Sequence, residues 1–281
     1  MIGFVKQPTG RMGNVLIQYC YLRQLAERIE TEYFHPTLPY AEYFYGFEKK
    51  SLPLKKRLIS RRYVVSNQEI VQLGTEKFIC DCRERIKENQ IIVLNPPVLG
   101  HLFEFKEENP ARFISLKKKS AKLDKRGKYN LILGIHFRGT DFKEWNEKAS
   151  LPFEYYENAI QYLINKNEGT KIGVKLFTDD NNFESYKKTV QYINMCVPEW
   201  DVIYMSNIQK TMIDDFEELS QCDWIISSPS TYAIMAGLIG KPHKCIIHAK
   251  QWVEYAVANG EAFWIDIQKH QVPYYDVVKI L

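Results

Sequence analysis

The chain has 281 residues, of which 45% are hydrophobic and 26% are charged, and its formal net charge is +4. This composition is typical of a globular protein with a large core, arranged as one large domain or two smaller ones. A charge of +4 is too small to indicate a nucleic-acid-binding protein. No apolar run approaches the ~20 residues that span a bilayer. The N-terminus lacks the basic and apolar regions of a signal peptide, so we expect a cytoplasmic protein.

Aromatic residues make up 14% of the chain, with 18 Tyr. Such rings often stack on sugars in sugar-handling proteins, but they serve equally well to fill an aromatic core. The six Cys residues form no C-x-x-C pair. Reduced thiols are therefore a better interpretation than a zinc site.

The first residues predict a strand, a loop and a helix. The strand covers residues 2–6, and Pro8-Thr9-Gly10 ends it. Apolar residues then recur at helical spacing from Val15 to Ile29, which predicts a helix with one buried face. Asn14 is the expected N-cap, because its side chain can accept from free amides of the first turn. A glycine-containing loop before a helix lets backbone amides approach an anion closely.

The following residues are less regular. Residues 36–63 are aromatic and basic, and suit either a loop packed by its own rings or a platform for an acceptor sugar. Two helices over 67–74 and 75–88 and a strand over 91–94 are expected next. Residues 117–128 hold seven basic residues and one acid. Such a run is typical of a solvated helix face or a linker, so we place a domain boundary near residue 125. Attraction to anionic lipid headgroups, and hence a peripheral membrane association, is the second interpretation of this run.

The second half alternates between strands and helices. Strands are expected over residues 129–137, 171–177, 201–204, 223–227 and 244–248. Helices are expected over residues 152–165, 211–222 and 230–239, and a further helical stretch is expected between Asp180 and about residue 196. This alternation predicts an α/β fold with a doubly wound parallel sheet.

Polar residues follow several of these strands, where open α/β sheets bind ligands. Arg138 offers a planar set of donors that matches a phosphate. Ser228 and Ser230 precede a helix whose N-terminus favours an anion. Asp179 suits hydrogen bonds from a purine such as guanine, and Asp180 suits a cap of the next helix. The two carboxylates point to opposite sides of an extended chain and no D-x-D motif occurs, so we expect no metal site.

Four stretches, in order, resemble the GDP-fucose-dependent fucosyltransferases of the α1,2, α1,6 and protein-O-fucosyl superfamily. His136-x-Arg138-x-Thr140-Asp141 resembles its H-x-R-x-(G/T)-D signature. The other three are Gly10-Arg11-Met12-Gly13-Asn14 with Gln18-Tyr19, then Phe177-Thr178-Asp179-Asp180, and then Asp215 to Ser220 with Ile225 to Ser230. The sequence departs from the pattern at Gly139, where many α1,2 enzymes have a second arginine, and in lacking Trp-Trp after the serines. These departures concern the linkage that is formed.

The resemblance implies a GT-B fold, with two Rossmann-like domains and a cleft between them. Residues 1–125 would form an acceptor-facing α/β domain and residues 126–281 a nucleotide-sugar-binding domain, with the C-terminal tail packing back on the first. The implied activity is an inverting, metal-independent transfer of L-fucose, of the α1,2 type, with GDP-β-L-fucose as donor substrate and no cofactor.

The implied site has two parts. Its donor-binding residues are Arg11, Gly13, Asn14, His136, Arg138, Asp179, Ser227, Ser228 and Ser230. Its catalytic residues are Arg138, which stabilises the leaving diphosphate, and Asp141 or Glu144 as general base. The expected partners are GDP-fucose and an acceptor oligosaccharide or glycoconjugate, with no nucleic acid. Two alternatives are a transferase for another nucleotide sugar and a catalytically silent sugar-binding protein on the same fold.

Overall fold

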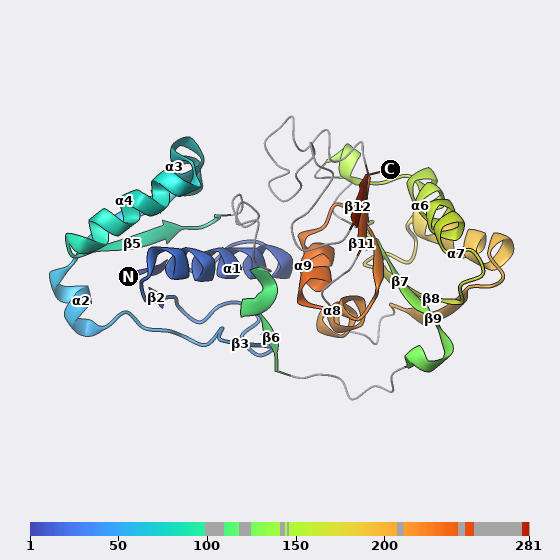
Figure 1. Cartoon of the computed structure of the whole chain (residues 1–281), viewed down its shortest axis with the longest axis horizontal. Coiled ribbons are helices and arrows are strands. Elements are labelled where there is room, and N and C mark those ends of the chain that lie inside the picture. The colour runs from blue at the N-terminus through green and yellow to red at the C-terminus, as the bar shows by residue number, and fades with distance from the viewer. Residues whose placement is uncertain are drawn as a thin grey trace. The chain divides into compact units, whose positions relative to one another are not determined.

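The computed structural model describes residues 1–98, 110–117, 125–140, 144, 146–206, 211–240, 245–249 and 277–280. The chain divides into two compact units, Met1–Lys118 and Lys119–Leu281. Each unit is built on its own parallel β-sheet (Figure 1). The expected C-terminal tail falls largely outside the described residues.

Unit 1 has a four-stranded parallel sheet in the order β2-β1-β5-β4. A short antiparallel pair, β3 and β6, lies outside it. The strands are β1 (Ile2–Phe4), β2 (Tyr33–Phe34), β3 (Phe44–Tyr45), β4 (Arg61–Ser66), β5 (Gln90–Asn95) and β6 (Ser115–Leu116). The helices are α1 (Met12–Ile29), α2 (Leu54–Ile59), α3 (Asn67–Leu73) and α4 (Thr75–Lys87), with a 3₁₀ turn, η2, at Pro110–Phe113.

The helices α1, α3 and α4 agree with the sequence, but two expectations for unit 1 were wrong. Residues 36–63 were expected to be irregular, whereas they contain β3, α2 and the start of β4. Asn14 was expected to cap α1, whereas the helix begins at Met12 with Arg11 at the N-cap position. The reason is Gly10, whose φ of +96° turns the chain immediately before Arg11, so Asn14 already lies inside the helix.

Unit 2 has a six-stranded parallel sheet in the order β12-β11-β10-β7-β8-β9. Its strands are β7 (Leu131–Phe137), β8 (Ile172–Thr178), β9 (Asp201–Met205), β10 (Trp224–Ser227), β11 (Cys245–His248) and β12 (Val277–Ile280). Its helices are α6 (Phe153–Lys166), α7 (Glu184–Cys196), α8 (Met212–Ser220) and α9 (Thr231–Ile239), with 3₁₀ turns η3 (Lys125–Lys128) and η4 (Glu147–Ala149). Counted along the chain, the strand order is 3-2-1-4-5-6, the order of the Rossmann fold. This confirms the doubly wound parallel sheet expected from the sequence.

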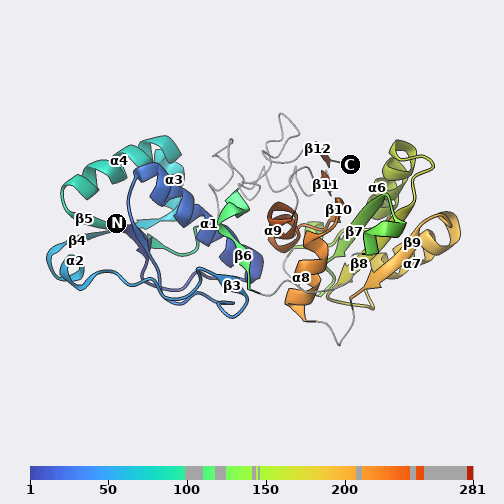
Figure 2. The same cartoon turned by 60° about the horizontal axis from the view of Figure 1, so that its bottom comes forward.

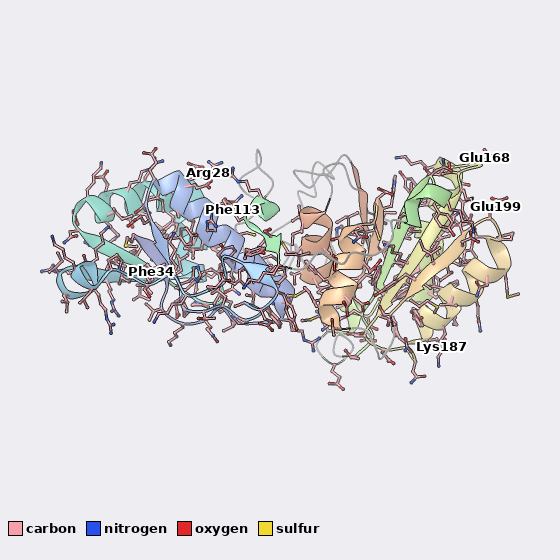
Figure 3. The ribbon with its side chains drawn as sticks, turned by 90° about the horizontal axis from the view of Figure 1, so that it is seen from below. Arg28, Phe34, Phe113, Glu168, Lys187 and Glu199 are labelled. Carbon is pink, nitrogen blue, oxygen red and sulfur yellow. The ribbon has the colours of Figure 1, made fainter. Side chains whose placement is uncertain are left out.

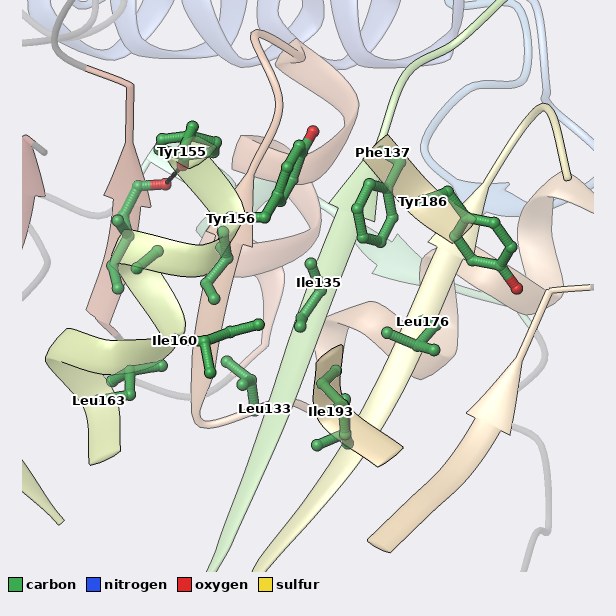
Figure 4. Packing of buried hydrophobic residues seen from close by; sticks show 14 of the residues in the cluster. Leu133, Ile135, Phe137, Tyr155, Tyr156, Ile160, Leu163, Leu176, Tyr186 and Ile193 are labelled. Atoms are coloured by element: carbon green, nitrogen blue, oxygen red, sulfur yellow. Dashed lines mark hydrogen bonds between the residues drawn. The ribbon is translucent and has the colours of Figure 1, made fainter. Parts of the chain in front are cut away.

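The sheet of unit 2 is buried on both faces. Ile135 and Phe137 of β7 are fully buried in a core that also holds Tyr156 of α6 and Ile193 of α7 (Figure 4). Burial of each such side chain contributes about 1.5–3 kcal/mol. Helix α8 covers the other face, because a Cβ at Gly134 would meet Leu219 at 2.7 Å. The central strands therefore read as continuous apolar runs, as parallel sheets require.

Several charged side chains lie on the outside of unit 2. Glu168, Lys187 and Glu199 point away from its core into solvent (Figure 3). Among the residues that the structure describes, no helix is both long and apolar enough to cross a membrane.

Candidate active site

The candidate site lies where the strand order of unit 2 reverses direction, between β7 and β10. These strands are neighbours (Figure 2), and His136 is in register with Ser227 at their carboxyl ends. The chain continues from β7 towards α6 and from β10 into α9. Doubly wound sheets bind their ligands at this reversal point, outside the carboxyl ends of the strands. Neither the strand order nor the reversal point could be read from the sequence alone.

His136 and Ser228 join the two strand ends. The ring Nδ1 of His136 and the hydroxyl of Ser228 share a hydrogen bond of 2.7 Å, and the amide of Ser228 donates to the carbonyl of His136. His136 is buried, and burial lowers its pKa to about 4. At neutral pH the imidazole is therefore uncharged, and it can orient Ser228 or a ligand but cannot act as a fixed cation.

Arg138 is held in place by Asp179 at the end of β8. Its Nε forms an ion pair with Oδ2 of Asp179 at 3.1 Å, and the two side chains are 14% and 27% exposed. Asp179 also accepts from the amide of Gly139 and from the hydroxyl of Thr140, both at 2.8 Å. One carboxylate thus organises three consecutive residues after β7. Both carboxylate oxygens of Asp179 are thus engaged by the loop after β7, and its expected recognition of a purine stays a prediction.

The serine segment begins helix α9. Ser227, Ser228 and Ser230 are all buried, and Ser230 is the N-cap residue, although its side chain makes no capping hydrogen bond. The hydroxyl of Ser227 donates to the carbonyl of Ser228 at 2.6 Å. The helix N-terminus behind these serines carries the partial positive charge that favours phosphate.

Gly139 and Asp180 show why the loop after β7 has its shape. A Cβ at Gly139 would lie 2.8 Å from Cβ of Phe183 and 3.1 Å from Cβ of Asp180. A side chain therefore does not fit at position 139 unless Phe183 moves. The expectation that Asp180 caps α7 was wrong, because the N-cap residue is Phe183. Asp180 instead closes the turn before the helix, where its Oδ1 accepts from the amide of Asn182 at 2.8 Å.

Unit 1 carries the other expected donor-binding residues after β1. Arg11 is exposed, Gly13 is buried and Asn14 is partly buried, all in the first turn of α1 or next to it. This places the three on the carboxyl side of β1, which lies beside β5 in the sheet. Like Arg138 in unit 2, these residues follow the carboxyl end of a parallel strand.

Three residues contribute to these loops that were not assigned a role from the sequence. Gln18, which is fully buried, donates to the carbonyl of Thr9 at 2.8 Å and accepts from the amide of Val98 at 3.2 Å. It therefore ties together the loops after β1 and β5. In unit 2, the hydroxyl of Tyr155 lies 2.9 Å from the carbonyl oxygen of Ser227 and 2.8 Å from that of Ile247 (Figure 4).

Tyr232 of α9 is the third such residue. Its ring centroid lies 5.6 Å from that of His136, so it packs the imidazole against the helix. The Q-Y pair of the family motif marked Gln18. No sequence signal distinguished Tyr155 or Tyr232 from other core aromatics.

The two candidate bases differ in what the structure shows. Asp141 lies outside the described residues. Glu144 is described, and its side chain is exposed. Within the described part of the chain, no three His, Cys, Asp or Glu side chains are grouped in a way that could hold a metal ion.

Comparisons with known proteins agree on the fold. No protein-family model matches the chain, and no curated protein matches it. Among solved structures, POFUT1 in complex with GDP-fucose is similar with a TM-score of 0.55 at 10% identity, covering 85% of this chain and 93% of that chain. A variant of Arabidopsis thaliana FUT1 in complex with GDP is similar with a TM-score of 0.54 at 10% identity, and the match covers 86% of this chain and 70% of that chain. The fucosyltransferase NodZ from Bradyrhizobium is similar with a TM-score of 0.50 at 13% identity, and the match covers 85% of this chain and 93% of that chain.

The similarity to these structures covers 85–86% of this chain and therefore extends over both of its units. The expected fold class is thereby confirmed. The chain has the GT-B fold of the GDP-fucose-dependent fucosyltransferases.

Proposed function

We propose that the chain transfers L-fucose from GDP-β-L-fucose to a hydroxyl group of an acceptor glycan. The observation that carries this proposal is the Arg138 guanidinium, fixed by Asp179 at the reversal point of a Rossmann-type sheet. Beside it lie the His136–Ser228 pair and the N-terminus of α9. The fold likeness to structures that contain GDP-fucose or GDP supports guanine nucleotides as the donor class.

The chemistry that this site would perform is stabilisation of a leaving diphosphate. As the bond between the anomeric carbon and the phosphate oxygen breaks, negative charge accumulates on the diphosphate. A cation and amide dipoles that are already in place stabilise this charge without reorganising. Arg138 would supply the cation and α9 the dipole, so the proposed transfer needs no metal ion. His136 would position the ligand or Ser228 as a neutral group.

The proton of the acceptor hydroxyl needs a base, and inversion follows if the acceptor attacks from the side opposite the diphosphate. We propose Glu144 or Asp141 for this role, because both follow the Arg138 loop in the sequence. The acceptor would be bound by unit 1 and the nucleotide by unit 2. An α1,2 linkage stays a prediction from the motif resemblance, from which Gly139 departs.

Calorimetric titration with GDP, GDP-fucose and UDP in the presence of EDTA tests the donor class. We expect binding of both guanine ligands and not of UDP. Arg138→Ala should abolish guanine-ligand binding, whereas Lys187→Ala, which removes an exposed cation of the same unit, should leave it unchanged. Binding of UDP instead of GDP would favour a transferase for another nucleotide sugar.

A second measurement separates a transferase from a silent sugar-binding protein. A transferase should hydrolyse GDP-fucose slowly when no acceptor is present, with release of fucose and GDP. GDP-fucose that binds but stays intact, with every acceptor glycan offered, would refute the enzymatic proposal.

A further inference from the structure

The short helix α2 of unit 1 buries none of its side chains. Leu54, Leu58 and Ile59 are 69%, 75% and 60% exposed. Single exposed aliphatic residues are common on protein surfaces, but three on one helix of six residues expose a concentrated apolar area. A helix this short gains little from its own hydrogen bonds. Its apolar side chains therefore need an explanation other than the core.

The exposed apolar area extends to strand β4, which lies next to α2 at the edge of the sheet (Figure 2). Alternate residues of β4 face opposite sides. Tyr63 and Val65 face helix α4, since Val65 is buried and the guanidinium of Arg85 lies 3.6 Å from the Tyr63 ring. Val64 therefore faces the other side, where it is 55% exposed.

Positive charge surrounds these apolar side chains. Residues 49–66 contain no acidic residue and these basic ones: Lys49, Lys50, Lys55, Lys56, Arg57, Arg61 and Arg62. Among the described residues, only Lys56 of this set lies within ion-pair distance of a carboxylate, at 4.0 Å from Glu32. We define the basic–apolar surface by its exposed members: Leu54, Lys55, Arg57, Leu58, Ile59, Arg62 and Val64.

We infer that the basic–apolar surface binds an anionic lipid bilayer. Aliphatic side chains enter the boundary between headgroups and acyl chains, while basic side chains next to them attract anionic headgroups. Protection of an edge strand against aggregation would explain charges on β4, but not three exposed aliphatic residues on α2. A second copy of the same surface would bring like charges together and is disfavoured.

This surface is distinct from the lysine-rich run at residues 117–128, to which the sequence analysis assigned lipid attraction. That run lies mostly outside the described residues, whereas α2 and β4 are described throughout. The inference also does not depend on the proposed transfer reaction, because neither α2 nor β4 contributes a residue to the candidate site.

Sedimentation with phospholipid vesicles tests the inference on the full chain. We expect binding to vesicles that contain phosphatidylglycerol and none to vesicles of phosphatidylcholine alone. Each basic residue near an anionic surface strengthens binding roughly fivefold. Lys55→Ser with Arg57→Ser should therefore weaken vesicle binding roughly twenty-fivefold. Leu54→Ser with Leu58→Ser should weaken it roughly tenfold through lost apolar insertion.

The matched control is Lys77→Ser with Lys187→Ser, which removes the same net charge from exposed positions on α4 and α7. It should bind vesicles like the wild type. Because the changed side chains of α2 are exposed, circular dichroism and GDP titration should give wild-type results for every variant. Equal weakening in the control, no vesicle binding by the wild type, or a wild-type dimer that Leu58→Ser dissociates would each overturn the inference.

Discussion

Replacing Asp179 with alanine tests whether this residue positions Arg138 or reads the base of the nucleotide. The carboxylate accepts hydrogen bonds from Gly139 and Thr140 and forms an ion pair with Arg138. Without it, Arg138 has to be ordered by the ligand itself. Ordering an arginine side chain costs about 1.5–2 kcal/mol of rotamer entropy. GDP should therefore bind roughly ten- to thirtyfold more weakly to Asp179→Ala.

If Asp179 positions Arg138, the loss of affinity in Asp179→Ala should be the same for every ligand that carries a diphosphate. Calorimetric titration with GDP and with pyrophosphate separates the two roles, because pyrophosphate has no base. A positioning role predicts an equal loss of affinity for both ligands. Asp180→Ala is the control, since its carboxylate closes a neighbouring turn without contacting Arg138 in any hydrogen bond or ion pair found among the described residues.

The stability of unit 2 should change as well. A hydrogen bond to a charged group contributes about 1.5–3 kcal/mol. Asp179 is 27% exposed, so water replaces part of what is lost. We expect a loss of about 2–3 kcal/mol in the free energy of unfolding, or about 5 °C in Tm. If Asp179→Ala lost affinity for GDP but not for pyrophosphate, the carboxylate would contact the base and the positioning argument would be refuted.

Three other predictions concern stability. Burial lowers the pKa of His136 to about 4, so the unfolded state binds the proton more tightly and stability falls as the pH drops from about 6.5 to about 4. In urea unfolding, the free energy of unfolding should fall by about 1.4 kcal/mol per pH unit over this range, and His136→Gln should remove this loss. His248, which has a pKa of about 3, should add a similar loss that persists in the His136→Gln variant. The pair Lys175–Glu218 has an N–O distance of 2.8 Å and side chains that are each 10% exposed. Glu218→Gln should therefore cost about 3 kcal/mol in urea unfolding, much of which a second change, Lys175→Met, should restore. Gln18→Leu should cost about 2 kcal/mol by leaving a buried amide without its acceptor, and an unchanged unfolding midpoint would refute that role.

Periodicity predicted most of unit 2 because α6, α7 and α8 each have one buried face and the central strands are continuous apolar runs. The same signals failed for β4, whose sequence begins with Arg61 and Arg62. An edge strand is buried over only part of its surface, so the pattern of apolar residues in its sequence is weak. The start of α1 was placed three residues late because the conformation of Gly10, and not the capping preference of Asn14, decides where the helix begins.

The candidate site was predictable in its residue types but not in its connections. Arg138, Asp179 and Ser228 each follow a strand, which the sequence shows. The contact between Arg138 and Asp179 depends on β7 lying beside β8, and the contact between His136 and Ser228 on β7 lying beside β10. These neighbours are separated by 41 and 92 positions along the chain. No local pattern encodes which strands become adjacent.

The close approach of Phe183 to Gly139 restricts how related sequences could change. An arginine at position 139 would have its Cβ 2.8 Å from the Cβ of Phe183 and 3.1 Å from that of Asp180. Every residue except glycine carries a Cβ, so a smaller side chain at position 183 would not remove this obstacle. A lineage that gained or lost the second arginine would therefore have to move the backbone of the turn before α7. Glycine substitutions, insertions or deletions in residues 180–183 should accordingly accompany a change at position 139 when sequences close to this one are compared.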